Sequence, residues 1–422
     1  MRKTSYESPS ADSIIFNIIR NEGSINRTDL VANTGFAKST VSLQINKLIE
    51  TGIIQEIKPK KSENTVRKLQ IEIVPDAGYV IGVFLGIHRL SISLFNLRME
   101  TILEAVYDLE SILNPEFINR LIIKKIDLLI SEAKIQKKSL WGIGLGFPFP
   151  VDFHQGISEA PPNLPLWHQY PVQAIYENHF SCPVLLDNDV NVMALGEAYS
   201  GIAQDENDFI FVKVGNGIGC GLFMEGRVYR GAKGSAGDIG HIALDRETKL
   251  CHCGNIGCLE TIAAAPSIAQ KGLEVAMTGD SPILQKKLAK NHKVTSKDVG
   301  EAAQMGDMFA LRIIKESGKN LGSVLAKLVI FANPGMVVIG GGVTKSGTLY
   351  LSAIREEILR KATHIATIDL QIRYTDLQDK CGPIGSGRLI IEDIFSSRNF
   401  TKTIEGKFNI PNALQDNNGK FL

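Results

Sequence analysis

The stretch GSAGDIGHIALDRETKLCHCGNIGCLE, residues 234–260, concentrates the distinctive chemistry of this chain. It contains His241 and three of the six cysteines of the chain, Cys251, Cys253 and Cys258. Three thiolates and one imidazole form the closed tetrahedral donor set of structural zinc, which leaves no position for a substrate. The alternative is three unrelated buried thiols, because free cysteine packs as a small hydrophobic residue. The clustering predicts the zinc site.

Part of this stretch resembles the signature of a known family. The segment AGDIGH, residues 236–241, followed by CHCGNIGCLE, residues 251–260, is similar to the signature of the ROK family of sugar kinases and sugar-responsive repressors. The resemblance implies an α/β fold with two lobes of the sugar kinase/actin-like (ribonuclease H-like) type. In the regulator branch of the family, it also implies an N-terminal winged helix-turn-helix domain.

Composition sets broad limits on location and partners. The length of 422 residues suggests two or three domains, and an apolar content of 44% is typical of a protein with real cores. The net charge of +1 gives no overall attraction to nucleic acid, so such a function requires a local basic patch. No signal peptide begins the sequence, and Lys327 and Pro334 interrupt its most apolar window. We therefore expect a cytoplasmic protein, nucleoid-associated when bound to DNA.

Residues 11–50 carry three helical patterns. Apolar residues recur at helical spacing in residues 11–21, 27–33 and 38–50, with Asn26 as a cap of the second helix and Gly35 in the turn after it. This is the helix-turn-helix pattern, whose second helix enters the major groove by its N-terminal residues. The side chains expected to face DNA from this helix are Lys38, Ser39, Thr40, Leu43, Asn46 and Lys47.

A β-hairpin wing is predicted after these helices. Residues 53–57 and 69–74 alternate as strands on either side of the basic stretch KPKKSENTVRK, residues 58–68. The basic residues expected to meet phosphates there are Lys58, Lys60, Lys61, Arg67 and Lys68. Residues 27–54 also resemble the winged helix of ROK repressors, although the Gly-Gly-Arg usual at the wing tip is here Thr65-Val66-Arg67. A small protein-docking module with a solvated charge run is the alternative.

Two later segments echo one another. Residues 79–97, YVIGVFLGIHRLSISLFNL, and residues 209–229, FIFVKVGNGIGCGLFMEGRVY, each read as two strands joined by a turn that contains glycine. Such an echo is typical of two duplicated lobes facing a cleft, although any hairpin has this pattern.

The turns of these two segments differ in a way that bears on activity. In ROK kinases the first turn reads Asp-x-Gly-Gly-Thr-Lys, and its aspartate helps to hold the magnesium–nucleotide complex. The matching residues of this chain run from Phe84 to Arg89, with Phe84 in place of the acid and Ile87 in place of a glycine. A β-branched residue resists positive φ, so this turn is expected to bind magnesium–ATP poorly. The second turn, residues 215–219, still resembles a phosphate loop, with Asn216 in place of the usual threonine.

The sugar side of the family pattern is better preserved. The segment LLDNDVNVMALGE, residues 185–197, places Asn188 and Asp189 where a strand meets a helix. By resemblance, Asp189 matches the general base of ROK kinases, here vestigial, and pairs with Asn188 to hold a sugar. An ordinary helix cap at a strand–helix junction is the alternative. The other sugar contacts that the resemblance implies are Asn163, Asp238, His241 and Glu260, with His241 serving metal and sugar together.

Two departures from the family pattern change the expected pocket. Asp238 replaces the commoner glutamate, and Phe149 stands where the family usually has a small glycine at the edge of the sugar. We expect both to alter the size of the pocket, and Phe149 to obstruct it. Trp167 is either a stacking wall for a pyranose or a core residue.

These observations predict a sugar-responsive DNA-binding transcriptional regulator, as a repressor of carbohydrate-utilisation genes. The expected partners are operator DNA, a monosaccharide or sugar derivative and a second copy of the chain, and the alternative is a hexose kinase. The expected parts are a winged helix-turn-helix domain at residues 1–75, one ROK lobe at residues 76–190, and a second lobe at residues 191–400. We place the zinc segment 241–258 and the C-terminal helix in the second lobe, and expect a flexible tail at residues 401–422.

Overall fold

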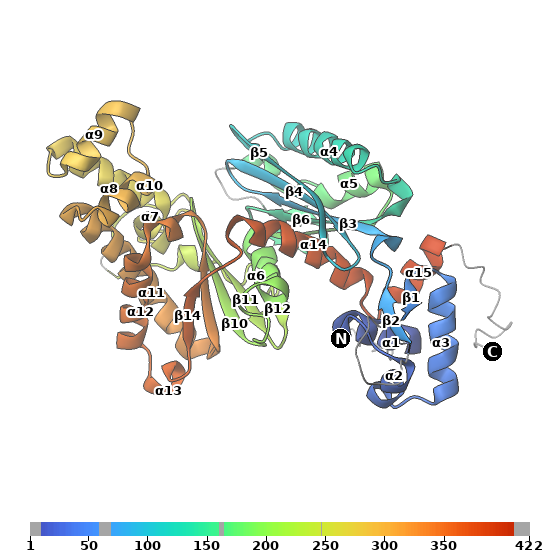
Figure 1. Ribbon diagram of the computed structural model, residues 1–422. Helices are drawn as coiled ribbons and strands as arrows, with labels where there is room; N and C mark the ends of the chain where they lie inside the picture. The colour runs from blue at the N-terminus through green and yellow to red at the C-terminus, as the bar shows by residue number, and fades with distance from the viewer. Residues whose placement is uncertain (1–9, 59–68, 160–163, 246, 409–422) are drawn as a thin grey trace.

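The computed structural model describes residues 10–58, 69–159, 164–245 and 247–408. Figure 1 shows an N-terminal module in blue beside one sheet-containing lobe, and a second lobe on the far side of a central gap. The predicted fold class, an N-terminal helical module followed by a two-lobed α/β domain, is confirmed. Among the described helices, none combines the length and the apolar composition needed to cross a membrane.

The N-terminal module contains the three predicted helices. Its elements are α1 (Ala11–Glu22), α2 (Arg27–Thr34), α3 (Lys38–Glu50), β1 (Ile54–Ile57) and β2 (Gln70–Ile73). The Asn26 side chain accepts hydrogen bonds from the backbone N–H groups of Thr28 and Asp29, at 3.0 and 3.1 Å, so the predicted cap is confirmed. Gly35 ends α2 at a φ of 67°, a left-handed conformation that glycine adopts at little energetic cost.

Strands β1 and β2 form the two-stranded ribbon that the alternating pattern predicts. They pair antiparallel, with Ile54 opposite Ile73, and Ile54, Ile71 and Ile73 are buried. The predicted basic residues Lys60, Lys61, Arg67 and Lys68 lie outside the described residues, whereas Lys58 is described and exposed.

The first lobe is a five-stranded sheet with two helices on one face. Its sheet elements are β3 (Tyr79–Leu85), β4 (Arg89–Asn96), β5 (Thr101–Asp108), β6 (Leu140–Phe147) and β9 (Val184–Asn188), and its helices are α4 (Pro115–Glu132) and α5 (Val172–Phe180). The short strands β7 (Val151–Asp152) and β8 (Ile157–Ser158) pair beside it. Every residue of β6 is buried, which is typical of a central parallel strand covered on both faces.

The second lobe repeats this sheet with a larger set of helices. Its strands are β10 (Phe209–Val214), β11 (Ile218–Met224), β12 (Arg227–Tyr229), β13 (Met336–Gly340) and β14 (Gln371–Tyr374). Its helices are α6 (Asp189–Ser200), α7 (Leu259–Ala263), α8 (Ala265–Thr278), α9 (Pro282–Asn291), α10 (Ser296–Gln304), α11 (Met308–Ala332), α12 (Thr348–Lys361) and α13 (His364–Thr367).

The two sheets have the same strand order. The first sheet runs β5-β4-β3-β6-β9 and the second runs β12-β11-β10-β13-β14, each with three antiparallel strands followed by two parallel ones. The echo seen in the sequence therefore reflects two lobes of equivalent topology, with β3–β4 and β10–β11 in equivalent places.

Helix α14 (Cys381–Ile394) lies against the first sheet rather than within the second lobe, where we expected the C-terminal helix. It packs on β3, β6 and α6, and a Cβ atom at Gly144 of β6 would overlap the backbone of Ser386 on α14. Glycine in the central strand therefore lets helix and sheet backbones touch. The sequence did not reveal this packing because α14 follows the second lobe in the chain.

The tail also differs from expectation in its first residues. Helix α15 (Phe400–Phe408) occupies residues that we expected to be frayed from residue 401, and Phe400 and Ile404 on it are buried. The Phe400 ring lies 4.7 Å from the ring of Phe16 on α1, measured between centroids. Tertiary packing against α1 thus orders a segment whose composition is polar. Residues 409–422 lie outside the described residues.

Candidate functional site

A cleft of about 970 Å³ lies between the two lobes and gathers most of the predicted sugar-binding residues. The first lobe contributes the end of β3, the β3–β4 turn and the segment after β6. The second lobe contributes the β10–β11 loop and the start of the stretch that carries the predicted metal ligands, residues 234–260, which we call the metal segment. Of the predicted sugar contacts, Asn188, Asp189, Asp238, His241 and Glu260 line this cleft. Asn163 lies outside the described residues.

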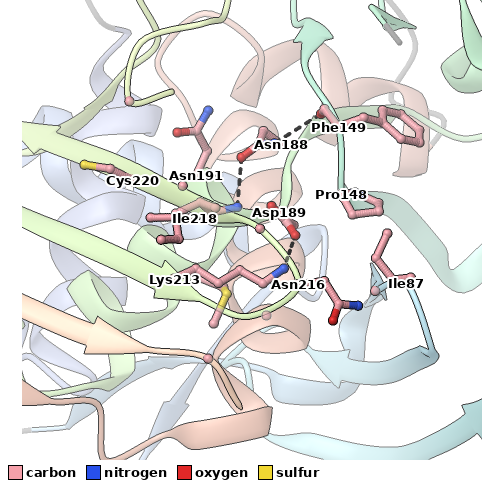
Figure 2. A pocket seen from close by; sticks show the side chains of 18 of the residues that line it. Ile87, Pro148, Phe149, Asn188, Asp189, Asn191, Lys213, Asn216, Ile218 and Cys220 are labelled. Atoms are coloured by element: carbon pink, nitrogen blue, oxygen red, sulfur yellow. Dashed lines mark hydrogen bonds and ion pairs between the residues drawn. The ribbon is translucent and has the colours of Figure 1, made fainter. Parts of the chain in front are cut away.

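The β9–α6 junction holds Asn188 and Asp189 at the centre of the cleft. The Asn188 Oδ1 atom accepts from the N–H of Val190 at 3.0 Å and so caps α6, while its Nδ2 atom donates to the Phe149 carbonyl at 3.1 Å. Figure 2 shows both bonds. Asn188 is therefore a helix cap, as the alternative reading supposed, and a link to the first lobe. Asp189 begins α6 with its side chain 6% exposed.

The carboxylate of Asp189 is engaged by Lys213. The Lys213 ammonium on β10 donates to Asp189 Oδ2, as Figure 2 shows. The same ammonium lies 5.7 Å from the centroid of the Phe84 ring. The ion pair occupies the carboxylate that the resemblance matches to the general base, which favours a binding role for Asp189 over proton abstraction.

The β3–β4 turn has no backbone concavity suited to a phosphate. The Gly86 N–H donates to the Arg89 carbonyl at 2.7 Å, so the turn uses this donor for itself. Phe84 packs its ring against α14, where a Cβ atom at Gly382 would overlap it. Arg89 extends from the turn to Asp379, with 3.1 Å between Nη1 and Oδ2. The acid and the glycine that the resemblance requires for magnesium–ATP are replaced by two apolar side chains, Phe84 and Ile87, which pack against hydrophobic clusters.

The ring of Phe149 turns away from the cleft. Phe149 is 2% exposed and packs against Trp167, with 4.8 Å between ring centroids. Figure 2 shows the ring directed away from Asp189, so the Phe149 backbone, not its ring, borders the cleft. Trp167 is fully buried and donates its Nε1–H to the Ile112 carbonyl at 2.7 Å, which makes it a core residue and not a stacking wall.

The metal segment supplies the other wall of the cleft. His241 directs its two ring nitrogens to different neighbours, with Nδ1 3.5 Å from Cys251 Sγ and Nε2 3.8 Å from Asp238 Oδ1. Glu260 Oε2 accepts from the N–H of Ile218, the first residue of β11 after the β10–β11 loop, at 3.0 Å. The side chain of Asp238 is 53% exposed and free to meet a ligand. One histidine is thus placed to contact both a metal and a cleft ligand.

The four predicted metal ligands converge. The donor atoms of His241, Cys251, Cys253 and Cys258 all lie within 4.8 Å of one another. The Cys253 and Cys258 sulfurs are 3.7 Å apart, near the separation of two ligands at the corners of a zinc tetrahedron. Burial raises the pKa of the Cys258 thiol, and a bound cation would favour its thiolate form. Geometry and donor chemistry both fit zinc.

The N-terminal module exposes most of the side chains that were expected to face DNA. Lys38, Ser39, Leu43, Asn46 and Lys47 are exposed on α3, and Thr40 is half-buried. The Asn46 Oδ1 atom accepts from Arg27 Nη2 at 2.9 Å, so its amide is partly engaged within the module.

Several charged or imidazole side chains in this region were missed from the sequence, and two of them, Lys213 and His252, line the cleft. Lys213 interrupts the apolar strand FIFVKV, and that single charge was the available signal. Arg230 forms an ion pair with the 2% exposed Asp187 at 2.7 Å, and no sequence pattern indicates this pair. His252 lies between two predicted ligands, and its Nδ1 atom is 3.5 Å from Glu260 Oε1.

Comparisons with known proteins agree on one family. The model of the ROK family matches residues 80–393. A xylose repressor from Caldicellulosiruptor bescii is 30% identical over 374 residues, which are 88% of this chain and 93% of the repressor. A glucokinase from Halalkalibacterium halodurans is 34% identical over 266 residues, which are 63% of this chain and 80% of the glucokinase.

A solved structure matches the whole arrangement. It is the crystal structure of a ROK family transcriptional regulator, a homologue of the Escherichia coli MLC protein, and it superposes with a TM-score of 0.81. The sequence identity is 24%, and the match covers 94% of this chain and 98% of that chain. The likeness shows that both chains share one fold.

Proposed function

The chain belongs to the ROK family, and from that premise we propose that it is a sugar-responsive DNA-binding regulator of transcription. It represses carbohydrate-utilisation genes and leaves its operator when a sugar effector binds. Similarity to a xylose repressor over nearly the full length of both chains supports this proposal.

One observation carries the proposal: helix α14 joins the interlobe cleft to the N-terminal module. Its first turn contains Gly382, which lines the cleft beside Phe84. Near its other end, Glu392 forms an ion pair with Arg20 of α1, and the adjoining Phe395 ring lies 4.6 Å from the Phe16 ring. A ligand that shifts α14 at the cleft thereby moves the helix-turn-helix. A regulator requires this connection, whereas a kinase does not.

DNA recognition is assigned to α3 and the β1–β2 ribbon. The exposed polar residues of α3 read base edges, while Lys38 and Lys47 of α3 and the basic hairpin, with Lys58 at its described end, contact phosphates. One recognition helix covers only a half-site, so we propose a homodimer on a pseudo-palindromic operator. The effector favours a dimer geometry in which the two α3 helices no longer match the half-site spacing.

The cleft binds the sugar through hydrogen bonds between the sugar hydroxyls and the carboxylate and imidazole groups of the cleft. Asp189, Asp238 and Glu260 are acceptors for hydroxyl donors, and His241 Nε2 faces the same space. We assign structural zinc to the four converging ligands, where it fixes the orientation of His241 and thus links metal geometry to effector contact. The cytoplasm, where thiols stay reduced, suits such a site.

A second candidate function is a hexose kinase of the same family. The glucokinase relative and the retained Asp189 favour it. Phe84, the self-bonded Gly86 and the ion pair between Lys213 and Asp189 oppose it. An assay of ATP turnover with a panel of hexoses separates the two functions, because a regulator shows no sugar-dependent turnover at ordinary enzyme rates.

DNA binding is tested by the salt dependence of variants. Lys38→Ala with Lys47→Ala on α3 is expected to make the plot of log affinity against log salt shallower, because each lost phosphate contact lowers its slope by about 0.9. Lys319→Ala, on α11 of the second lobe, is the matched control and leaves the slope unchanged. Equal slopes for the wild type, the α3 variant and the control would contradict the assignment of α3 to DNA.

A further inference from the structure

We propose that the cleft contains an anion subsite built on Lys213, and that the effector is a sugar bearing an oxyanion group, a phosphomonoester or a carboxylate, next to Asp189. The inference rests on the proposed function, whose effector class it narrows. The subsite lies on the phosphate side of the cleft, between the β3–β4 turn and the β10–β11 loop.

The position of Lys213 is the first argument. Its ammonium ends beside the carboxylate of Asp189, deep in the cleft, and its side chain is 24% exposed. An ammonium has three donors, and Asp189 is the partner found for this one among the described residues. Figure 2 shows Lys213 extending from β10 across the cleft to Asp189. An oxyanion on a bound sugar can accept a hydrogen bond from a second N–H of the same ammonium.

The absence of an acid at position 84 is the second argument. A phosphate side that uses magnesium requires carboxylates for the cation, but Phe84 presents an apolar ring there. With Phe84 below it and Asp189 beside it, Lys213 supplies a positive charge fixed to the protein. A fixed ammonium binds a phosphate or carboxylate directly, whereas a metal-dependent site needs acids that this turn lacks.

The charge balance of the outer phosphate side is the third argument. Arg89 and Lys345 both line the cleft and both pair with Asp379, at 3.1 and 3.7 Å, and Arg89 also lies 4.0 Å from Asp108 Oδ1. Of these two acids only Asp379 lines the cleft, so both cations are presented at the mouth of this side. The sugar side instead carries Asp238 and Glu260. A ligand with hydroxyls at one end and an oxyanion at the other matches this polarity.

The size of the cleft agrees with such a ligand. Its volume of about 970 Å³ spans both the sugar side and the phosphate side. A neutral monosaccharide on the sugar side alone leaves Lys213 paired only with Asp189. An oxyanion substituent extends the ligand to Lys213, while a ring hydroxyl still reaches Asp189. The geometry therefore makes Lys213 the residue that distinguishes charged from neutral sugars.

Direct binding to the full chain tests this subsite without DNA. Isothermal titration compares glucose, mannose and N-acetylglucosamine with their 6-phosphates, glucose with glucuronate, and inorganic phosphate alone. We expect an anionic member of at least one pair to bind about tenfold or more tightly than its neutral partner, the size expected of a charge-assisted hydrogen bond. A preference for the 6-phosphate or for glucuronate identifies which oxyanion the site takes.

Two variants assign the preference to Lys213. Lys213→Met is expected to abolish it, and Lys213→Arg, which keeps the charge and the pairing with Asp189, to retain most of it. Lys319→Met removes the same charge from α11 and is expected to leave the preference intact. If Lys213→Met fails to fold, a wild-type preference that Lys213→Arg retains and that falls steeply with added salt supports the subsite, because an ammonium–oxyanion contact is screened.

Three results would overturn the inference: neutral sugars binding as tightly as their anionic partners, a preference that survives in a folded Lys213→Met, or no binding by any anionic probe. A neutral sugar that binds and releases DNA would sink the anion subsite and leave the regulator intact. An anionic sugar that binds through Lys213 without changing DNA affinity would sink the regulator and leave the subsite standing.

Discussion

The β3–β4 turn and the β10–β11 loop occupy equivalent places in the two lobes, yet they are held in different ways. The first turn closes on itself, with the Gly86 N–H bonded to the Arg89 carbonyl at 2.7 Å. The second is held by a side chain of the metal segment, because Ile218 donates its N–H to Glu260 at 3.0 Å. One turn depends on local backbone, and the other depends on Glu260, two positions after Cys258 of the proposed metal site.

This difference teaches where the function of a duplicated fold resides. The strand order is the same in both lobes, so the scaffold does not distinguish the two turns. The residues placed on them do, since the first turn begins at Phe84 and contains Ile87, whereas the second contains three glycines and follows Lys213 on the preceding strand. Loops on a rigid scaffold change role without changing the fold.

Loss of the metal is expected to destabilise the β10–β11 loop and to leave the β3–β4 turn unchanged, which is the largest difference we expect between the two turns. Cys253→Ser is expected to release zinc and to unfold residues 234–260, with a melting temperature lower by roughly 10 °C or more. Hydrogen exchange should accelerate at the β10–β11 loop and remain unchanged at the β3–β4 turn. Cys182→Ser, a buried free thiol of the first lobe, is the control. Wild-type metal content and melting temperature in Cys253→Ser would refute the structural zinc site.

Rebuilding the first turn should not restore a kinase. Phe84→Asp with Ile87→Gly is expected to lower the free energy of unfolding by about 1–3 kcal/mol, because Ile87 packs against the core of the first lobe and Phe84 against a cluster formed mainly by second-lobe residues. Sugar-dependent ATP turnover should remain absent, since Lys213 still holds Asp189. Denaturant titration and a coupled ATPase assay measure the two effects. Sugar-dependent turnover in the wild type would contradict an inactive first turn. Turnover in this variant alone would contradict the claim that the Lys213–Asp189 ion pair prevents catalysis.

The bond between the metal segment and the second turn can be tested alone. Glu260→Gln keeps an acceptor but removes its charge, so we expect a loss of about 1 kcal/mol and faster exchange of the Ile218 amide. The Gly86 amide should exchange as in the wild type. Glu225→Gln, an exposed residue of the same lobe, is the matched control and should change neither. Equal acceleration at both turns would mean that Glu260 acts on the whole molecule.

A smaller effect concerns Glu197, which lies where the two lobes meet. Burial raises the pKa of this fully buried carboxyl, which contacts Thr375 after β14 and Cys381 on α14. A raised pKa in the folded state contributes stability that is complete below the ordinary value of 4.5 and is lost as the pH rises through the folded pKa.

Denaturant titrations across this range test that sign. The wild type should lose stability relative to Glu197→Gln as the pH rises above 4.5, and the difference between the two curves isolates Glu197 from carboxyls with lowered pKa values. A difference that is flat, or that grows in the opposite direction, would contradict the buried neutral carboxyl.

Local patterns predicted much of the molecule. The three N-terminal helices, the two-stranded ribbon and the metal ligands follow from spacing within short segments, and the structure brings His241 to three cysteines as expected. The sequence did not predict that α14 packs on the first sheet, that α15 docks on α1, or that Lys213 pairs with Asp189. These contacts join segments far apart in the chain. Periodic patterns in the sequence indicate local structure and do not indicate which distant segments pack together.

The most direct test is the fluorescence anisotropy of labelled DNA from upstream of the gene, titrated with the full chain and then with sugars and sugar phosphates. The account predicts specific binding that one sugar or sugar derivative reverses, and it predicts that Arg20→Ala, which cuts the link between α1 and α14, weakens this response more than it weakens DNA binding. Absence of specific DNA binding, or binding that no member of the panel changes, would contradict a sugar-responsive regulator.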